Sequence, residues 1–156
     1  MTTPPSLLAR QACLCNTVRR ADRLLNRVYD DALRPSGLLT TQYALLSALG
    51  RAAAPLAHSA LAEQQAMSPT TLSRNLKPLQ RDGLVQVAPG EDRRARYVSI
   101  TPVGRAALQR ALPLWRQVQA QMRQEAGDAH VDLLLAELNA LVTRLRERLP
   151  EGEQHA

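Results

Sequence analysis

The chain has 156 residues, and its 20 Lys and Arg against 14 Asp and Glu give a formal net charge of +6. This length fits one domain, and 45% of apolar residues can bury a core, which excludes a wholly disordered chain. No apolar run approaches the roughly 20 residues that a membrane-spanning helix needs, and the N-terminal residues lack the hydrophobic region of a signal peptide. We therefore expect a soluble, cytoplasmic protein that does not contact a membrane.

The N-terminal segment predicts one long helix over residues 6–33, because it contains neither glycine nor proline. Its apolar residues recur at alternating steps of three and four, which is typical of an amphipathic helix whose apolar seam packs against another helix. The seam comprises Leu7, Leu14, Val18, Ala21, Leu25, Val28 and Ala32, with Gln11 at its one polar position. The sequence Arg-Pro-Ser-Gly at residues 34–37 then ends the helix.

Two short helices are expected next. The first covers residues 40–50, with Thr40 or Thr41 as its N-cap. The second runs roughly from His58 to Gln65 and turns Leu61 inward.

A third short helix is expected from Ser68 to Asp82, with Ser68 as N-cap and Pro69 at the first helical position, where its missing N–H costs nothing. On a helical wheel at about 100° per residue, its apolar and polar side chains separate. One side carries Leu72, Leu76 and Leu79, and the opposite side carries Thr70, Arg74, Lys77 and Arg81. Any solvated amphipathic helix shows such a division, so this helix alone leaves its function open.

The polar face of this third helix suits insertion into the major groove of DNA. Arginine and lysine reach guanine acceptors or phosphates, and hydroxyl and amide groups contact bases or the backbone. The helix N-terminus can also donate N–H groups to a phosphate. The candidate DNA-contacting residues of this helix are Ser68, Thr70, Thr71, Ser73, Arg74, Asn75 and Lys77.

The pattern then changes to period two at residues 84–87 and 97–100, which predicts a β-hairpin. Two long helices are expected after it. One starts after the cap at Thr101 and runs towards Glu125 with a bend at Pro113. The other covers residues 128–149, where leucine and valine again recur in steps of three and four.

The hairpin tip carries Arg93, Arg94 and Arg96, which can enter a minor groove whose negative potential is strongest where it is narrow. Asp92 would be repelled by phosphate, so we expect it to hold an arginine in place by a charge-assisted pair. An ordinary charged turn is the alternative. Six cations against three acids between residues 68 and 97 favour the DNA interpretation.

Together these elements predict a mainly α fold with a small β-hairpin wing: a winged helix-turn-helix flanked by N- and C-terminal dimerisation helices. We expect a single domain over residues 1–156, with a DNA-binding lobe over residues 38–101 and dimerisation helices over residues 6–33 and 102–149. The flanking helices are too apolar on one face to stand alone. They are expected to pack together and against a second copy of the chain.

Three runs of sequence resemble the MarR family of bacterial transcriptional regulators: LLTTQYALLSAL, LAEQQAMSPTTLSRNLKPLQRDGLV and EDRRARYVSITPVG. The most specific elements are the LQRDGLV exit of the third helix and the wing's DRR followed by I-T-x-x-G. The resemblance, which covers nearly the whole chain, implies a homodimer that binds a pseudo-palindromic operator in double-stranded DNA. It also implies that Arg94 enters the minor groove, oriented by Asp92, and that the stretch from Ser68 to Lys77 contacts bases and phosphates.

Cys15 lies near the start of the long helix, with Cys13 before it and Tyr29 fourteen residues after it. This resembles the branch of the family that senses organic hydroperoxides through an N-terminal cysteine, whose thiolate is hydrogen-bonded by tyrosines. Tyr29 matches one of these tyrosines, whereas Arg19 and Thr40 stand where the branch carries others.

Geometry limits this redox interpretation. Fourteen helical residues span roughly 21 Å, so Tyr29 would reach Cys15 only from the partner chain. Cys13 and Cys15 would project about 200° apart and could not bridge within one helix. Two small side chains packed in a dimer core are the alternative, and the sequence leaves both interpretations open.

We therefore expect a homodimeric, sequence-specific DNA-binding regulator, a repressor that a small ligand or cysteine oxidation, for instance by a hydroperoxide, releases. The alternative is a winged-helix protein-interaction module without sequence-specific DNA binding. We expect no enzyme, no cofactor and no metal site, because the chain has no Gly-rich phosphate loop, no metal-ligand cluster and no nucleophile–base spacing. His58 is expected at the surface of the second short helix and His130 in the first turn of the last helix. The sequence does not identify the lining of an effector cleft.

Overall fold

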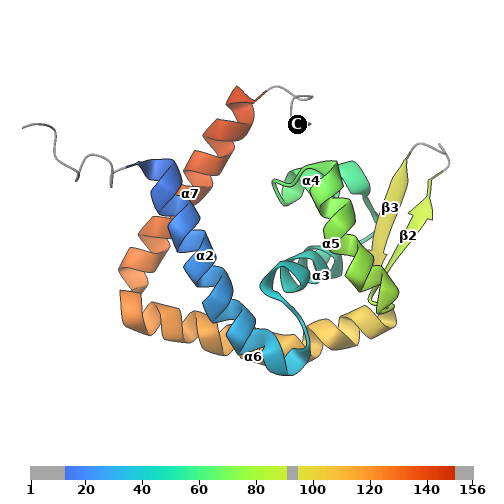
Figure 1. Ribbon diagram of the computed structural model, residues 1–156, viewed down its shortest axis with the longest axis horizontal. Coiled ribbons are helices and arrows are strands. Elements are labelled where there is room, and N and C mark those ends of the chain that lie inside the picture. Colours follow the sequence, from blue (N-terminus) through green and yellow to red (C-terminus); the bar gives the residue numbers. More distant parts are fainter. Residues whose placement is uncertain (1–12, 91–94, 150–156) are drawn as a thin grey trace, which may run out of the picture.

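The computed structural model describes residues 13–90 and 95–149 (Figure 1). Its helices are α2 (Leu14–Leu33), α3 (Thr40–Arg51), α4 (His58–Gln64), α5 (Pro69–Arg81), α6 (Pro102–Ala126) and α7 (Asp128–Arg148), and a 3-10 turn, η1 (Arg34–Ser36), follows α2. Its strands are β1 (Leu56–Ala57), β2 (Val85–Pro89) and β3 (Arg96–Ile100). This order confirms the expected mainly α fold with a β-hairpin wing.

The sheet has three antiparallel strands in the order β1–β3–β2. Val98, in the central strand, pairs with Leu56 of β1 on one side and with Val87 of β2 on the other. The sequence predicted the hairpin of β2 and β3 but missed β1. A strand of two residues is too short to show the alternation by which strands are recognised.

The core lies in the lobe formed by α3, α4, α5 and the sheet, and the end of α2 closes it. The largest fully buried side chains are Leu33, Leu45, Leu46, Leu61, Leu72, Leu76, Leu79 and Val98. Three of these eight belong to α5, and α4 contributes Leu61, as predicted. The leucines fix the rotation of α5 about its axis and thereby decide which of its residues face outwards.

The start of α3 differs from the prediction. Leu39, not a threonine, is the N-cap residue, and its backbone N–H donates to Gln42 Oε1 at 2.9 Å. Thr40 instead donates from its backbone N and from Oγ1 to Asp30 Oδ1, at 2.6 and 2.7 Å. This carboxylate ties the first turn of α3 to α2.

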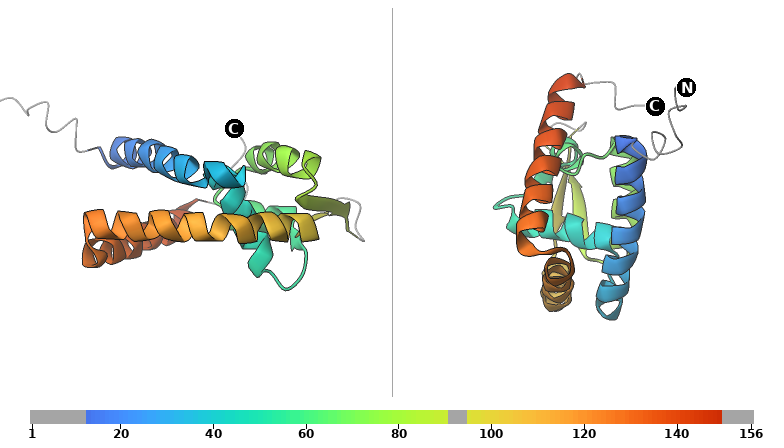
Figure 2. Two further views of the ribbon diagram at one scale, coloured as in Figure 1. Left: turned by 90° about the horizontal axis from the view of Figure 1, so that it is seen from below. Right: turned by 90° about the vertical axis from the view of Figure 1, so that its left-hand side faces the viewer.

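The long helix α6 begins at the lobe and extends away from it (Figure 1). Helices α2 and α7 both contact α6. Thr101 is the N-cap of α6 as predicted, and its Oγ1 accepts from the backbone N of Gly104 at 3.0 Å. The helix passes Pro113 as one continuous element, so the expected bend does not divide it. Gly127, with φ of +86°, ends α6 and allows α7 to fold back (Figure 2).

The expected packing of the flanking helices on each other is seen where α2 and α7 contact α6. Much of their apolar surface nevertheless stays exposed. In α7 no described residue is buried, and Leu133 and Leu134 are 60% and 58% exposed. Residues 6–12 of the predicted N-terminal helix lie outside the described part of the chain, and Cys13 is the N-cap of α2.

One side chain joins the end of α7 to the lobe. Arg146 Nη2 donates to the backbone oxygens of Glu63 and Gln64 at 2.8 and 3.2 Å. These carbonyls lie at the C-terminal end of α4, where the helix dipole favours a cation.

None of the described helices combines the length and the apolar character needed to cross a bilayer.

Candidate nucleic-acid interface

The helix α5 begins and packs as its sequence predicts. Ser68 is the N-cap, and its Oγ accepts from the backbone N of Thr71 at 3.1 Å. The apolar residues Leu72, Leu76 and Leu79 are at most 2% exposed. Because this face is held in the core, the opposite face of α5 is presented to solvent in one defined orientation.

The cationic side chains of α5 lie on the exposed face. Arg74, Lys77 and Arg81 are all exposed, together with Thr70. Arg81 forms an ion pair with Asp82, with Nε 2.9 Å from Oδ1. Their hydrogen bond raises the pKa of the Arg81 guanidinium and lowers that of the Asp82 carboxyl. Among the described residues, no ion pair engages Arg74 or Lys77, which leaves both cations available to an anionic partner.

Three other candidate DNA contacts of α5 already have partners inside the lobe. Thr71 Oγ1 accepts from Ser68 Oγ at 2.9 Å, and Asn75 Nδ2 lies 3.5 Å from Met67 Sδ. Ser73 Oγ lies 3.0 Å from Nε2 of His58. Asn75 is half-buried, and its contact links the middle of α5 to Met67, just before the helix.

The wing is described only in part. Arg96 is exposed at the start of β3, beside α5. Asp92, Arg93 and Arg94 lie outside the described residues, so the predicted pairing of Asp92 with Arg94 stays a prediction.

A model of the MarR family matches residues 36–95, the segment from the end of α2 to the wing. The transcriptional regulator MosR of M. tuberculosis, solved in complex with DNA, is 44% identical in sequence. That match covers 86% of this chain and 98% of MosR, with a TM-score of 0.75. This chain belongs to the MarR family of winged-helix transcriptional regulators.

Two further similar proteins are described as transcriptional regulators. A probable transcriptional regulator from Pseudomonas aeruginosa is 26% identical over 84% of this chain and 98% of its own, with a TM-score of 0.74. The uncharacterized HTH-type regulator YwoH of Bacillus subtilis is 28% identical over 88 residues, which are 56% of this chain and 64% of YwoH. The chain therefore aligns with less than two thirds of this curated relative.

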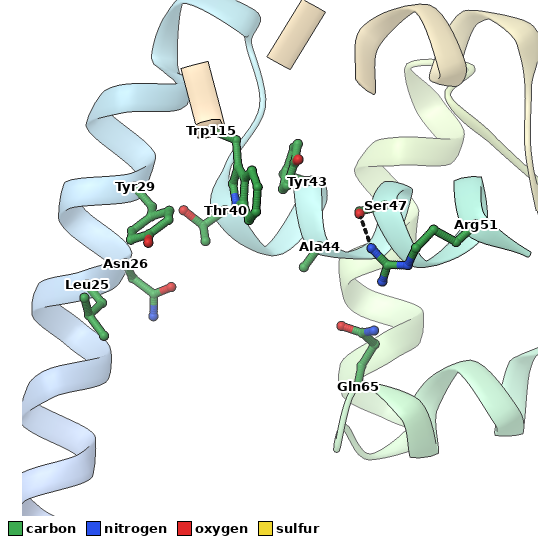
Figure 3. A pocket seen from close by; sticks show the side chains of 10 residues that line it. All are labelled: Leu25, Asn26, Tyr29, Thr40, Tyr43, Ala44, Ser47, Arg51, Gln65 and Trp115. Carbon is green, nitrogen blue, oxygen red and sulfur yellow. Dashed lines mark hydrogen bonds between the residues drawn. The ribbon is translucent and has the colours of Figure 1, made fainter. Parts of the chain in front are cut away.

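A cavity of about 400 Å³ separates the lobe from the long helices (Figure 3). It lies between α2, α3 and α6, and Gln65 borders it from the end of α4. Tyr43 and Trp115 stack in its wall, with ring centroids 5.7 Å apart and planes inclined by 19°. Of the chain's four aromatic residues (3 Tyr and 1 Trp), three line this cavity. Because aromatic residues are so few in this sequence, their positions are the sequence signal that could have indicated the cavity.

Tyr29 faces this cavity from α2 (Figure 3). Burial raises the pKa of its phenol, so the hydroxyl stays protonated at neutral pH. At the opposite side, Arg51 Nη1 donates to Ser47 Oγ at 2.7 Å. The cavity thus offers aromatic walls, one phenolic hydroxyl and one guanidinium.

The two cysteines lie far from the lobe, at the start of α2. Both are free and exposed in the described chain. Cys13 has extended backbone angles, φ −72° and ψ 111°, and caps the helix that contains Cys15. Because Cys13 is not helical, the separation of about 200° expected for two helical positions does not apply to Cys13 and Cys15.

Proposed function

We propose that a homodimer of this chain binds a pseudo-palindromic DNA operator and thereby regulates transcription. The observation that carries this proposal is the division of α5 into a buried leucine face and an exposed face with Arg74 and Lys77. Each protomer would insert α5 into the major groove, while the wing approaches the adjacent minor groove. Such a regulator would act in the cytoplasm, where bacterial DNA lies.

The proposal is tested with fluorescence anisotropy on duplexes from the region upstream of the gene that encodes this chain. We expect Arg74→Ala to weaken binding by about 1–3 kcal/mol, which corresponds to roughly fivefold to 150-fold. Arg110→Ala removes another exposed arginine, from α6, and serves as the matched control. Equal affinity of both variants and the parent would contradict the proposed role of α5.

The same assay separates the alternative function. A protein-interaction module that no longer reads DNA would bind every duplex equally, or none, at low ionic strength. A regulator would instead prefer one upstream duplex, with an affinity that falls steeply with salt because phosphate contacts release counterions.

We also propose that a small aromatic molecule releases the operator by binding the cavity beside Trp115. The residues that line the cavity support this proposal. Stacked rings accept a planar ligand, and Arg51 and Tyr29 can orient its polar groups. Because Trp115 is the only tryptophan, its fluorescence reports occupancy directly. A phenolic library should contain a ligand that changes this emission and raises Tm. Ser47→Leu, which fills the cavity, should abolish both effects.

Cysteine oxidation is the second proposed release mechanism, with Cys15 as the sensor. Its support is the exposure of Cys15 and Cys13 near the start of α2. Tyr29 would reach Cys15 only from the partner chain of a dimer. If hydroperoxide releases the operator through this thiol, Cys15→Ser should remain bound under treatment that dissociates the parent. Release of both proteins at the same hydroperoxide concentration would contradict the role of Cys15. Cys13→Ser tests whether the second thiol takes part.

A further inference from the structure

A groove of about 390 Å³ runs between α5 and the wing, on the side of the lobe away from the aromatic cavity. Residues at the start of α4, along α5 and at the paired ends of β2 and β3 line it. Its charged or titratable lining residues are Lys77, Arg96 and His58, and no carboxylate is among the described residues that line it. The described part of the groove wall is therefore cationic.

His58 is held in this groove by a defined contact. Its Nε2 lies 3.0 Å from Ser73 Oγ, which joins the start of α4 to α5. A hydroxyl can donate to a neutral imidazole and accept from a charged one, so this contact persists in both protonation states. Burial and the nearby charge of Arg96 lower the pKa of His58, so the ring is mainly neutral at neutral pH.

The position of the groove indicates its ligand. It adjoins the exposed face of α5, and Lys77 belongs both to that face and to the groove. When a helix enters the major groove, the phosphates of the flanking strand lie along its sides. A phosphate monoanion is bound by cationic side chains and by an imidazole, and a nearby carboxylate would repel it. The described lining of the groove offers two cations and an imidazole.

We propose that this groove binds a backbone phosphate of the DNA and that His58 contacts this phosphate directly. The inference rests on the proposed DNA-binding function. It adds that His58 contacts the DNA and that Lys77 and Arg96 contact the same phosphate. From the sequence alone, His58 is expected only at the surface, because its neighbours Ser73 and Arg96 are 15 and 38 positions away along the chain.

A phosphate at this place changes the charge balance around His58. Among the described residues of the groove, the charged groups near His58 are Lys77 of α5 and Arg96 of β3, with Ser73 as the uncharged partner. The bound phosphate adds a negative charge to this cationic surrounding. The imidazole then takes up a proton from solvent and becomes an imidazolium that pairs with the phosphate. Linkage requires that DNA affinity increase as pH falls, because the complex binds more protons than the free protein.

The experiment measures duplex affinity by anisotropy from about pH 8 to about pH 5.5 at constant ionic strength, in buffers without phosphate. The parent should bind more tightly at the acid end, about tenfold per protomer for each unit by which DNA raises the pKa of His58. His58→Gln keeps a polar side chain and should bind with a much flatter profile. His130→Gln, an exposed histidine on α7, is the matched control and should keep the parent's profile.

The outcomes separate this inference from the proposed function. If the parent binds no duplex, the DNA-binding function itself fails. If the parent binds and His58→Gln shows the same pH profile, the role of His58 is overturned while the function stands. Circular dichroism and binding at about pH 8 establish that His58→Gln is folded.

A second arm distinguishes the source of the phosphate. The His58 ring signals are followed by NMR while pH is varied, with the duplex, with inorganic phosphate alone, and with neither. We expect the duplex to raise the pKa of His58 and inorganic phosphate to leave it nearly unchanged. An equal rise with inorganic phosphate would make the groove a general anion site and overturn its assignment to the DNA backbone.

Discussion

At the scale of single residues, two glycines show how closely α6 approaches the rest of the lobe. A Cβ at Gly104 would lie 2.0 Å from the backbone oxygen of Leu84, which also accepts from the backbone N of Thr101. A Cβ at Gly50 would lie 2.9 Å from Leu108 Cδ2, the end of a flexible side chain. The first contact is with backbone and cannot relax without moving a strand.

We therefore expect Gly104→Ala to lower the free energy of unfolding by about 1–3 kcal/mol, which is typical of overpacking. Gly50→Ala is the matched control, since Leu108 can rotate away and alanine favours the helix by up to about 1 kcal/mol over glycine. Urea denaturation of both variants checks this. A smaller loss for Gly104→Ala than for Gly50→Ala would refute the assigned contact.

At the scale of one element, the two faces of α5 have different roles. The buried face stabilises the lobe, and the exposed face is the one proposed to bind DNA. Leu79 is fully buried, whereas Lys77, two positions earlier, is exposed. Substitutions on the two faces should consequently change different measurements.

Leu79→Ala should lower the free energy of unfolding by about 2–5 kcal/mol, because it leaves a cavity in the core. Lys77→Ala should change stability by less than about 0.5 kcal/mol. It should nevertheless weaken duplex binding at all sequences and reduce the salt dependence by about one unit. Thermal melts and anisotropy at several salt concentrations would show both effects, and a large stability loss for Lys77→Ala would count against the assigned orientation of α5.

The elements differ in how far the sequence determines them. Ser68, Pro69 and the three leucines of α5 form a local pattern, so its start, its end and its two faces were all predicted correctly. The N-cap of α3 was missed because Asp30, ten residues away, takes the hydroxyl of Thr40. The cavity was not predicted because Tyr29, Tyr43 and Trp115 come together only after α2 and α6 have packed around α3.

At the scale of the whole molecule, the single chain leaves apolar side chains exposed along both α2 and α7. Val28 of α2 and Leu145 of α7 are 39% and 45% exposed, in addition to Leu133 and Leu134. Leucines repeated along helices at this exposure are typical of surfaces that associate. A second copy of the chain is the proposed occupant, since pseudo-palindromic operators require two equivalent lobes.

Leu134→Asp should shift the protein from dimer to monomer in light scattering and abolish operator binding, because it places a charge in the proposed interface. Asp132→Leu would not serve as a control, since Asp132 pairs with Arg123 at 2.8 Å. Glu147→Gln changes an exposed charge near the end of α7 and should remain a dimer. A monomeric parent at micromolar concentration would contradict the homodimer.

The bond from Arg146 to the end of α4 has a consequence for the spacing of operator half-sites. In a dimer joined through its terminal helices, the distance and angle between the two α5 helices depend on how firmly each lobe is attached to those helices. One inserted base pair moves a half-site by about 3.4 Å and rotates it by about 34–36° around the duplex. Arg146→Ala should therefore lose little affinity for the natural spacing but tolerate a lengthened spacer better than the parent, whereas Arg144→Ala should discriminate as the parent does. Binding to a series of duplexes with altered spacers would measure how rigidly one arginine sets the geometry that the operator must match.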